Sequence, residues 1–233
     1  MDAAQQKTLL SQAEALSDEA LVERILQGET PLFELVMRRH NQRLYRAARA
    51  IVREEAEAED VMQEAYVQAF THLAQFNRQA RLSTWLTKIA VHEGFARLRR
   101  TRRLADLELV SQQEPTSMPT TLSPPAPTPE QQAHSRELVS MLEKALERLP
   151  AAARAAFVLR DVEGLSTSEA AECLDISEDA IKTRLSRARA LLREELFARV
   201  GVAAQDTFAF YAPRCDRVVA AVMQRLPPVT AGS

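Results

Sequence analysis

Basic and hydroxyl side chains between Lys182 and Arg193 have the spacing of one side of a helix. The segment holds five basic residues and no acidic one. An apolar stripe lies on another side of the helical wheel, formed by Ile181, Leu185, Ala188, Leu192 and Leu196. The remaining arc carries Lys182, Thr183, Ser186, Arg187, Arg189 and Arg193. Guanidinium and hydroxyl groups can bond base edges, and cations neutralise phosphates. The pattern predicts a DNA-binding helix, and a solvated basic face on a three-helix bundle is the alternative.

A preceding helix is needed to position the basic one. Ser166 can cap this helix, with Glu169 three residues later to complete a capping box. A short polar turn follows, and Ser177 can cap the basic helix. Cys173, on the inner side of the first helix, is expected to be a small buried apolar residue. Two short helices with a tight turn, the second apolar on one side and basic on another, predict a helix-turn-helix.

A second basic segment spans residues 78–103, with eight basic residues against the single acid Glu93. A loop is expected over 77–82, after which Ser83 is expected to cap a long helix. One edge of that helix collects Trp85, Lys88, His92, Ala96, Arg99 and Arg103. Apolar residues occupy two other sides, so the helix is expected to be wedged into a core with this edge facing outwards. Cations there would neutralise phosphates and the indole ring could stack on a base. For Trp85, an ordinary core position is the alternative.

Three further helices are expected earlier in the chain. Ser17 or Asp18 can cap the first, and Thr30 can cap the second, with Pro31 at its first position. The third begins in the acidic stretch 54–64, where the helix dipole favours carboxylates. Helix capping and solubility explain these acids as well as an acidic face for a basic partner does, so both interpretations stay open.

A proline-rich segment divides the chain. Residues 112–133 hold six of the eleven prolines and no aromatic residue, which is typical of a disordered or extended linker. The predicted fold class is all-α: two small helical domains joined by a flexible linker, the second containing the helix-turn-helix, plus a short C-terminal extension. The expected boundaries are a flexible N-terminal extension (1–16), a first domain (17–104), a Pro-rich linker (105–134), a second domain (135–199) and the C-terminal extension (200–233).

Composition argues against several functional classes. Two cysteines give no disulfide framework, and the four scattered histidines give no zinc-ligand spacing. The N-terminus has no apolar signal segment, and nowhere do eighteen apolar residues run together. No nucleophile–base pair or glycine-rich phosphate loop is visible. We expect a cytoplasmic protein that is not an enzyme and uses no metal, cofactor, membrane or small-molecule substrate.

The order of these segments resembles the extracytoplasmic-function (ECF) sigma factors, in the sigma-70 family of bacterial RNA polymerase. The matching segments are Ala58 to Phe76, Ser83 to Val91 and Leu149 to Leu196, and with the opening helices the resemblance covers roughly residues 18–199. It implies a promoter-specificity subunit that binds core RNA polymerase and recognises and melts promoter DNA. Regulation by a separate anti-sigma protein is common in the family, although the sequence shows no site for one.

The resemblance also assigns roles to residues. The clamp helices of the polymerase large subunit would bind Asp60, Gln63 and Glu64. The −10 element would be bound by Asn77, Arg78, Arg81, Ser83, Trp85, Lys88, His92, Arg99 and Arg103. The −35 element would be bound by Lys182, Thr183, Arg184, Ser186 and Arg187, with Arg184 directed to phosphate. Leu86 replaces the second of two adjacent melting aromatics of primary sigma factors, so strand opening is expected to depend more on base capture in the loop.

Two other functions stay open at the level of sequence. One is a free-standing helix-turn-helix transcriptional regulator whose N-terminal half senses a ligand. The other is a protein-interaction module, such as an inhibitor that mimics a sigma factor. The extension contains an amphipathic helix near residues 218–226, whose apolar face must pack on the chain itself or on a partner. We expect it to pack on the chain and to modulate promoter activity.

Overall fold

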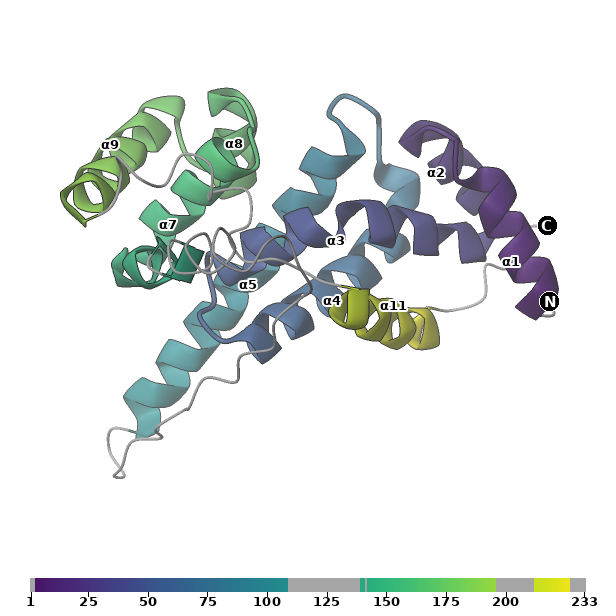
Figure 1. The fold of residues 1–233 in the computed structure, drawn as a ribbon, viewed down its shortest axis with the longest axis horizontal. Coiled ribbons are helices and arrows are strands. Elements are labelled where there is room, and N and C mark those ends of the chain that lie inside the picture. The colour runs from purple at the N-terminus through teal and green to yellow at the C-terminus, as the bar shows by residue number, and fades with distance from the viewer. Residues whose placement is uncertain (1–2, 109–138, 141, 196–211, 227–233) are drawn as a thin grey trace, which may run out of the picture.

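The computed structural model describes residues 3–108, 139–140, 142–195 and 212–226, and every regular element in these ranges is helical (Figure 1). The all-α fold class is therefore confirmed. Residues 105–108, predicted to begin the linker, instead form the end of a long helix. The rest of the proline-rich linker, and residues 200–211 and 227–233 of the C-terminal extension, lie outside the described residues. None of the helices in the described ranges is long and apolar enough to span a membrane.

The first domain is built around three long helices. Its elements are α1 (Ala3–Ala13), α2 (Asp18–Leu26), the 3-10 turn η1 (Thr30–Leu32), α3 (Phe33–Arg49), α4 (Glu55–Thr71), the 3-10 turn η2 (Leu73–Gln75) and α5 (Leu82–Glu108). Residues 3–13 were expected to be a flexible extension, but they form α1, and Ala13 at its end is fully buried. Alanine, leucine and glutamine all favour helix, so propensity and this contact explain the difference.

Two of the three expected helix caps in this domain are wrong. Ser17 does cap α2, since its hydroxyl accepts the amide N–H of Ala20 at 3.2 Å. Thr30, however, is the first residue of η1 and makes no side-chain cap, because Pro31 fits the opening of this tight turn and α3 begins only at Phe33. Likewise α5 begins at Leu82, one residue before Ser83, because Leu82 is drawn into the core.

The second domain contains the predicted helix-turn-helix. Helical residues at 139–140 and 142–148 precede α7 (Ala151–Phe157), the π-helical turn η3 (Val158–Val162), α8 (Thr167–Leu174) and α9 (Glu178–Glu195). The capping box of α8 is confirmed: the Ser166 hydroxyl accepts the Glu169 amide at 3.1 Å, and the Glu169 carboxylate accepts the Ser166 amide at 2.8 Å. The same backbone hydrogen bond lowers the pKa of Glu169. The Ser177 hydroxyl accepts the Ala180 amide at 3.2 Å and so caps α9 as predicted.

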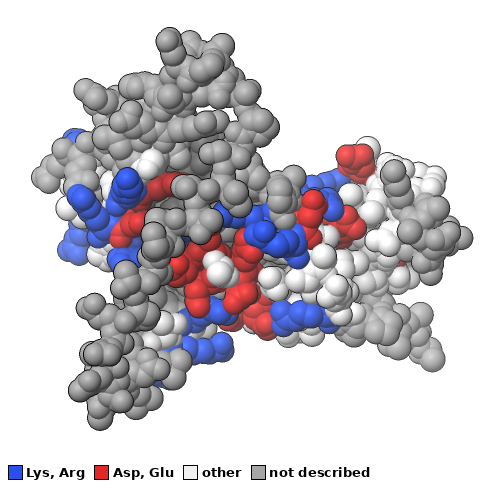
Figure 2. Space-filling model, turned by 60° about the horizontal axis from the view of Figure 1, so that its bottom comes forward, with Lys and Arg blue, Asp and Glu red and all other residues white. Residues whose placement is uncertain are grey.

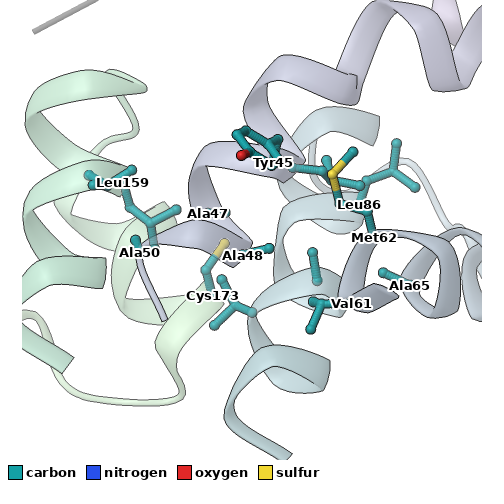
Figure 3. Close-up of a cluster of buried hydrophobic side chains, with 14 of the residues drawn as sticks. Tyr45, Ala47, Ala48, Ala50, Val61, Met62, Ala65, Leu86, Leu159 and Cys173 are labelled. Carbon is teal, nitrogen blue, oxygen red and sulfur yellow. The ribbon is translucent and has the colours of Figure 1, made fainter. Parts of the chain in front are cut away.

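The two domains share a buried interface at the end of α3. Leu159 and Cys173 of the second domain extend towards Ala47, Ala48 and Ala50 of the first (Figure 3). Cys173 is fully buried, as predicted, and burial raises the pKa of its thiol to about 12. Small alanine side chains allow this close approach between helices.

Charged groups reinforce this interface. The guanidinium of Arg154 is buried and donates to the carbonyl oxygens of Ala50 (2.5 Å), Ile51 (3.0 Å) and Leu149 (3.0 Å). The bonds to Ala50 and Ile51 join the second domain to the turn after α3, and the bond to Leu149 lies within the second domain. Burial lowers the pKa of Arg154 to about 10, so the group remains a cation at neutral pH. The carboxylate of Glu163 accepts from Arg43 and Arg46 of α3, each at 3.0 Å.

The last described element, α11 (Ala212–Arg225), lies against α3 and α4 (Figure 1). Val218 and Val222 are fully buried in this contact, and Val219 is nearly so. The expectation that the tail helix packs on the chain itself is confirmed.

Candidate nucleic-acid interface

The apolar stripe of α9 fixes which of its side chains face solvent. Ile181, Leu185, Ala188 and Leu192 are buried within the second domain, against α7 and α8. Consequently four of the five residues predicted to contact the −35 element are exposed, and the fifth, Arg184, is half-buried: Lys182, Thr183, Ser186 and Arg187 are the exposed ones. We call these five residues the recognition face.

Local contacts orient parts of the recognition face. The Lys182 ammonium lies 2.9 Å from the Asp179 carboxylate, which raises the pKa of Lys182, and the Thr183 hydroxyl donates to the Asp179 carbonyl at 2.9 Å. Arg189 donates to the Asp161 carboxylate at 2.9 and 2.6 Å and so ties α9 to η3. An open hollow of about 320 Å³ beside this face is lined by Arg160, Thr167, Lys182, Leu185, Ser186, Arg189 and Arg193. The arginine and lysine side chains that line it could bind the phosphate backbone of a nucleic acid.

The polar edge of α5 lies against the second domain. We define the α5 edge as Trp85, Lys88, His92, Arg99 and Arg103. The Lys88 ammonium lies 3.4 Å from the Glu172 carboxylate of α8, and the His92 Nε2 lies 2.9 Å from the carboxylate of Asp175, which directly follows α8. One turn earlier, the hydroxyl of Thr84 donates to Glu169 at 3.2 Å.

The expectation that the whole α5 edge faces outwards holds for His92, which is exposed although it is paired with Asp175, and is wrong in part at Lys88, which is half-buried. The helical wheel correctly separated polar from apolar sides, but the partner of the polar side is a set of carboxylates from the other domain. Arg99 and Arg103 lie further along α5 and are exposed, as predicted.

The beginning of the α5 edge belongs partly to the core. The Trp85 ring is half-buried, with its centroid 5.5 Å from that of Phe76 and the two planes at 47°. Packing thus accounts for one side of the indole and leaves part of it accessible. Both interpretations of Trp85 remain compatible with this position.

The loop before α5 has a defined conformation. Arg78 adopts a left-handed backbone (φ +60°), and its guanidinium pairs with Glu23 at 2.5 Å. The Asn77 side-chain oxygen accepts the Gln79 amide at 3.1 Å. Arg81 is exposed and Ser83 is half-buried in the first turn of α5. The structure thus gathers the residues predicted for the −10 element along one loop and one helix.

The acidic residues of α4 are paired with arginines from two other helices. Asp60 is exposed and lies 2.7 Å from Arg97 of α5. Glu64 lies 2.8 Å from Arg225 of α11, and Gln63, between them, is half-buried. We call Asp60, Gln63 and Glu64 the α4 face.

Sequence reasoning missed the groups that join the domains. Arg154 and Glu163 belong to no recognisable sequence pattern, and neither do the arginines of α3 to which Glu163 binds. A basic stripe on one helix does signal that a partner is needed, but it does not say which carboxylate supplies it. In the described parts of the chain, no group of three or more His, Cys, Asp or Glu side chains is arranged to hold a metal ion.

Comparison with known families defines the class of protein. The model of Sigma-70 region 2 matches residues 36–104, and the model of Sigma-70, region 4 matches residues 140–192. These two matches cover the helices that carry the α4 face, the α5 edge and the recognition face. The two helical domains are therefore those of the sigma-70 class.

Relatives that match most of the chain identify the family within this class. The ECF RNA polymerase sigma factor SigM of Mycobacterium tuberculosis is 32% identical over 176 residues, which cover 76% of this chain and 83% of SigM. The ECF RNA polymerase sigma-E factor of Haemophilus influenzae is 29% identical, covering 79% of this chain and 97% of the relative. The chain belongs to the ECF RNA polymerase sigma factors, and the resemblance inferred from the sequence is confirmed.

A solved structure agrees with this assignment. CnrH, in complex with the cytosolic domain of CnrY, superposes with a TM-score of 0.52 at 27% identity, covering 76% of this chain and 95% of CnrH. Family membership and fold together support a role in transcription initiation and do not favour a free-standing regulator.

Proposed function

We propose that this sigma factor binds core RNA polymerase through the α4 face and places two promoter elements on two different helices. The recognition face of α9 contacts the −35 element, and the loop 77–82 with the α5 edge contacts the −10 element. The observation that carries this proposal is the exposed recognition face, held in place by the buried apolar stripe of α9. A helix that is anchored on one side and exposes arginine, lysine and hydroxyl groups on the other fits a major groove.

Contacts to the −35 element divide into two kinds. Arg187 and Ser186 are exposed on α9, where a guanidinium can bridge two guanine acceptors and a hydroxyl can bond a base or phosphate. Arg184 lies on the flank, and the nearby hollow adds further cations. These flanking groups serve the backbone and set the register, whereas Arg187 supplies sequence preference.

Contacts of the −10 element with Lys88 and His92 compete with carboxylates of the second domain. In the free chain the two domains are in contact, which we call the closed arrangement, and Lys88 and His92 are paired with Glu172 and Asp175. Promoter DNA that binds Lys88 and His92 must therefore replace these carboxylates. Once free, Lys88 neutralises phosphate, and the accessible side of Trp85 stacks on an unpaired base. The loop at Arg78 is the place where a flipped base is captured.

The chain acts through binding and not through catalysis of its own. On the α4 face, Asp60 and Glu64 offer carboxylates to a basic surface on the clamp helices of the large subunit. This function places the chain in the cytoplasm, where core polymerase and promoter DNA meet. An anti-sigma protein is a further partner class, because the closed arrangement is one that a partner can stabilise.

Transcription with purified bacterial core polymerase tests the proposal. A library of promoter fragments is transcribed with and without the chain, and we expect specific transcripts only in its presence. Their aligned upstream sequences define both elements. Arg187→Ala should reduce transcription from promoters selected for their −35 sequence, while the matched Arg53→Ala, an exposed arginine of the first domain, should not.

Two results would contradict the proposal. One is failure to bind core polymerase. The other is sequence-specific binding to duplex operator DNA without polymerase, combined with no chain-dependent transcripts, which would support the free-standing regulator instead.

A further inference from the structure

The helix α11 combines an apolar stripe with a row of arginines. Val218 and Val222 of the stripe are fully buried between α11 and the α3–α4 pair. Cys215 extends the contact, since the Asn41 side-chain amide lies 2.8 Å from its sulfur. The stripe holds α11 along α4 (Figure 1).

The arginines of α11 pair with successive carboxylates of α4. Arg214 is paired with Glu55. Arg217 lies 2.8 Å from Glu59. The third pair, at 2.8 Å, joins Arg225 to Glu64. Acidic and basic side chains accordingly gather together on the face that carries α4 and α11 (Figure 2).

The third pair connects α11 to the proposed polymerase site. Glu64 belongs to the α4 face, and the carboxylate that would meet a basic surface on polymerase already meets Arg225. Glu59, one turn before Gln63, is only 16% exposed beneath Arg214 and Arg217. An incoming basic helix and α11 therefore require the same carboxylates.

We propose that the surface formed by α3 and α4 is a docking site for basic amphipathic helices, that α11 occupies it in the free chain, and that core polymerase must displace α11 to bind. The inference rests on the proposed role of the α4 face in polymerase binding. Only the fraction of chains with α11 released is competent, so the apparent dissociation constant is raised by the inverse of that fraction. Ion pairs with exposed members are weak and are screened by salt, so α11 can be displaced from this surface.

Binding of the full chain to purified core polymerase tests the inference. Arg217→Gln with Arg225→Gln removes two of the pairs and changes the net charge by −2. Its matched control is Ala220→Glu with Gln224→Glu, which makes the same charge change on exposed positions of α11. We expect the arginine variant to bind core polymerase about tenfold more tightly than the unmodified chain, because the loss of two exposed ion pairs makes the release of α11 easier by a comparable factor. The control should bind core polymerase with the same affinity as the unmodified chain.

A second variant and an independent readout measure release. Val218→Asp places a charge in the buried stripe and should release α11 more completely than the arginine variant does. Alkylation of Cys215 reports release directly, because its thiol is partly covered in the contact. We expect faster alkylation and tighter core binding together in both variants.

The failures of the two proposals differ. If Cys215 reacts faster in the variants but core affinity is unchanged or lower, competition by α11 is overturned while polymerase binding stands. If Cys215 is equally reactive in all chains, α11 does not cover the site, and the inference also fails. If neither the unmodified chain nor the released variants bind core, the proposed function itself fails.

Discussion

The two surfaces proposed to contact promoter DNA have similar chemistry but different availability. Both present basic groups along one side of a helix whose other sides are apolar. The recognition face of α9 is exposed, whereas Lys88 and His92 on the α5 edge are paired with carboxylates of the other domain. The free chain therefore exposes the surface proposed for the −35 element, and ion pairs occupy part of the surface proposed for the −10 element.

This difference follows from what each helix packs against. The stripe of α9 is buried within its own domain, and the carboxylates that pair with Lys182 and Arg189 belong to that domain as well. By contrast, α5 contributes to the first domain and also contacts α8. A helix shared by two domains has its polar edge covered whenever they are closed. The proposed binding of the −10 element would then compete with the contact between the two domains.

The reactivity of Cys173 gives the largest expected effect. Its thiol is fully buried at the domain interface, and burial raises its pKa to about 12. Relative to an ordinary thiol with a pKa of about 8.5, the thiolate fraction at pH 8 is lower by about three orders of magnitude. Alkylation of Cys173, followed by peptide mass spectrometry, should be correspondingly slow in the native chain and normal in urea.

The same pKa sets a pH dependence with a definite sign. The folded chain holds the neutral thiol, so above about pH 8.5 only the unfolded chain releases this proton. The contribution of Cys173 to folding stability should therefore fall as pH rises from about 8.5 towards 12. Fast native alkylation at pH 8 would show that the interface is open and would remove the contrast between the two surfaces.

Arg154→Met should give the next largest effect, a loss of folding stability together with opening of the interface between the two domains. Three carbonyl oxygens lose a buried cationic donor, and such hydrogen bonds contribute roughly 1.5–3 kcal/mol each. We expect a loss of about 3 kcal/mol in the free energy of unfolding, because water reaches part of the opened site. Urea unfolding measures this loss, and small-angle scattering should show a larger radius of gyration.

Arg53→Met is the matched control for this change. Arg53 is exposed on the turn after α3 and its charge repels Arg154, so its replacement should not lower the free energy of unfolding and should leave the radius of gyration unchanged. Equal behaviour of the two variants would mean that Arg154 does not hold the domains together.

Local contacts explain which parts of the molecule could be predicted from the sequence. The capping box of Ser166 and Glu169 and the apolar stripe of α9 involve residues three or four apart, and both are present. The contacts of Glu163 with Arg43 and of His92 with Asp175 join residues far apart in the chain, and no periodicity encodes such pairs. For this reason the pairing of Lys88 and His92 with carboxylates of the second domain could not be predicted. The prediction that Ser83 caps α5 was wrong because Leu82 is buried and the helix begins there, one residue earlier.

Arg187→Ala should affect the exposed surface alone. If Arg187 bonds a base, its loss should weaken binding of a −35 duplex by about 1–3 kcal/mol, with relaxed preference at one position. Fluorescence anisotropy with the duplex defined by the transcription experiment measures this effect. Binding of single-stranded −10 DNA should not change, and a matching loss there would show that the two surfaces are not separate.

Asp175→Asn is the smallest and sharpest change, because it uncovers the α5 edge without opening the interface. Asp175 has a left-handed backbone (φ +49°), which asparagine tolerates, so the fold should be retained. The change removes the carboxylate that lies 2.9 Å from His92 and 3.9 Å from Lys88. Exposed ion pairs contribute about 0.2–1 kcal/mol, so single-stranded −10 DNA should bind about two- to fivefold more tightly.

Glu178→Gln removes the same charge from an exposed position at the start of α9. An equal gain in that control would assign the effect to net charge, whereas a gain confined to Asp175→Asn would show that the second domain restrains the −10 surface through these contacts.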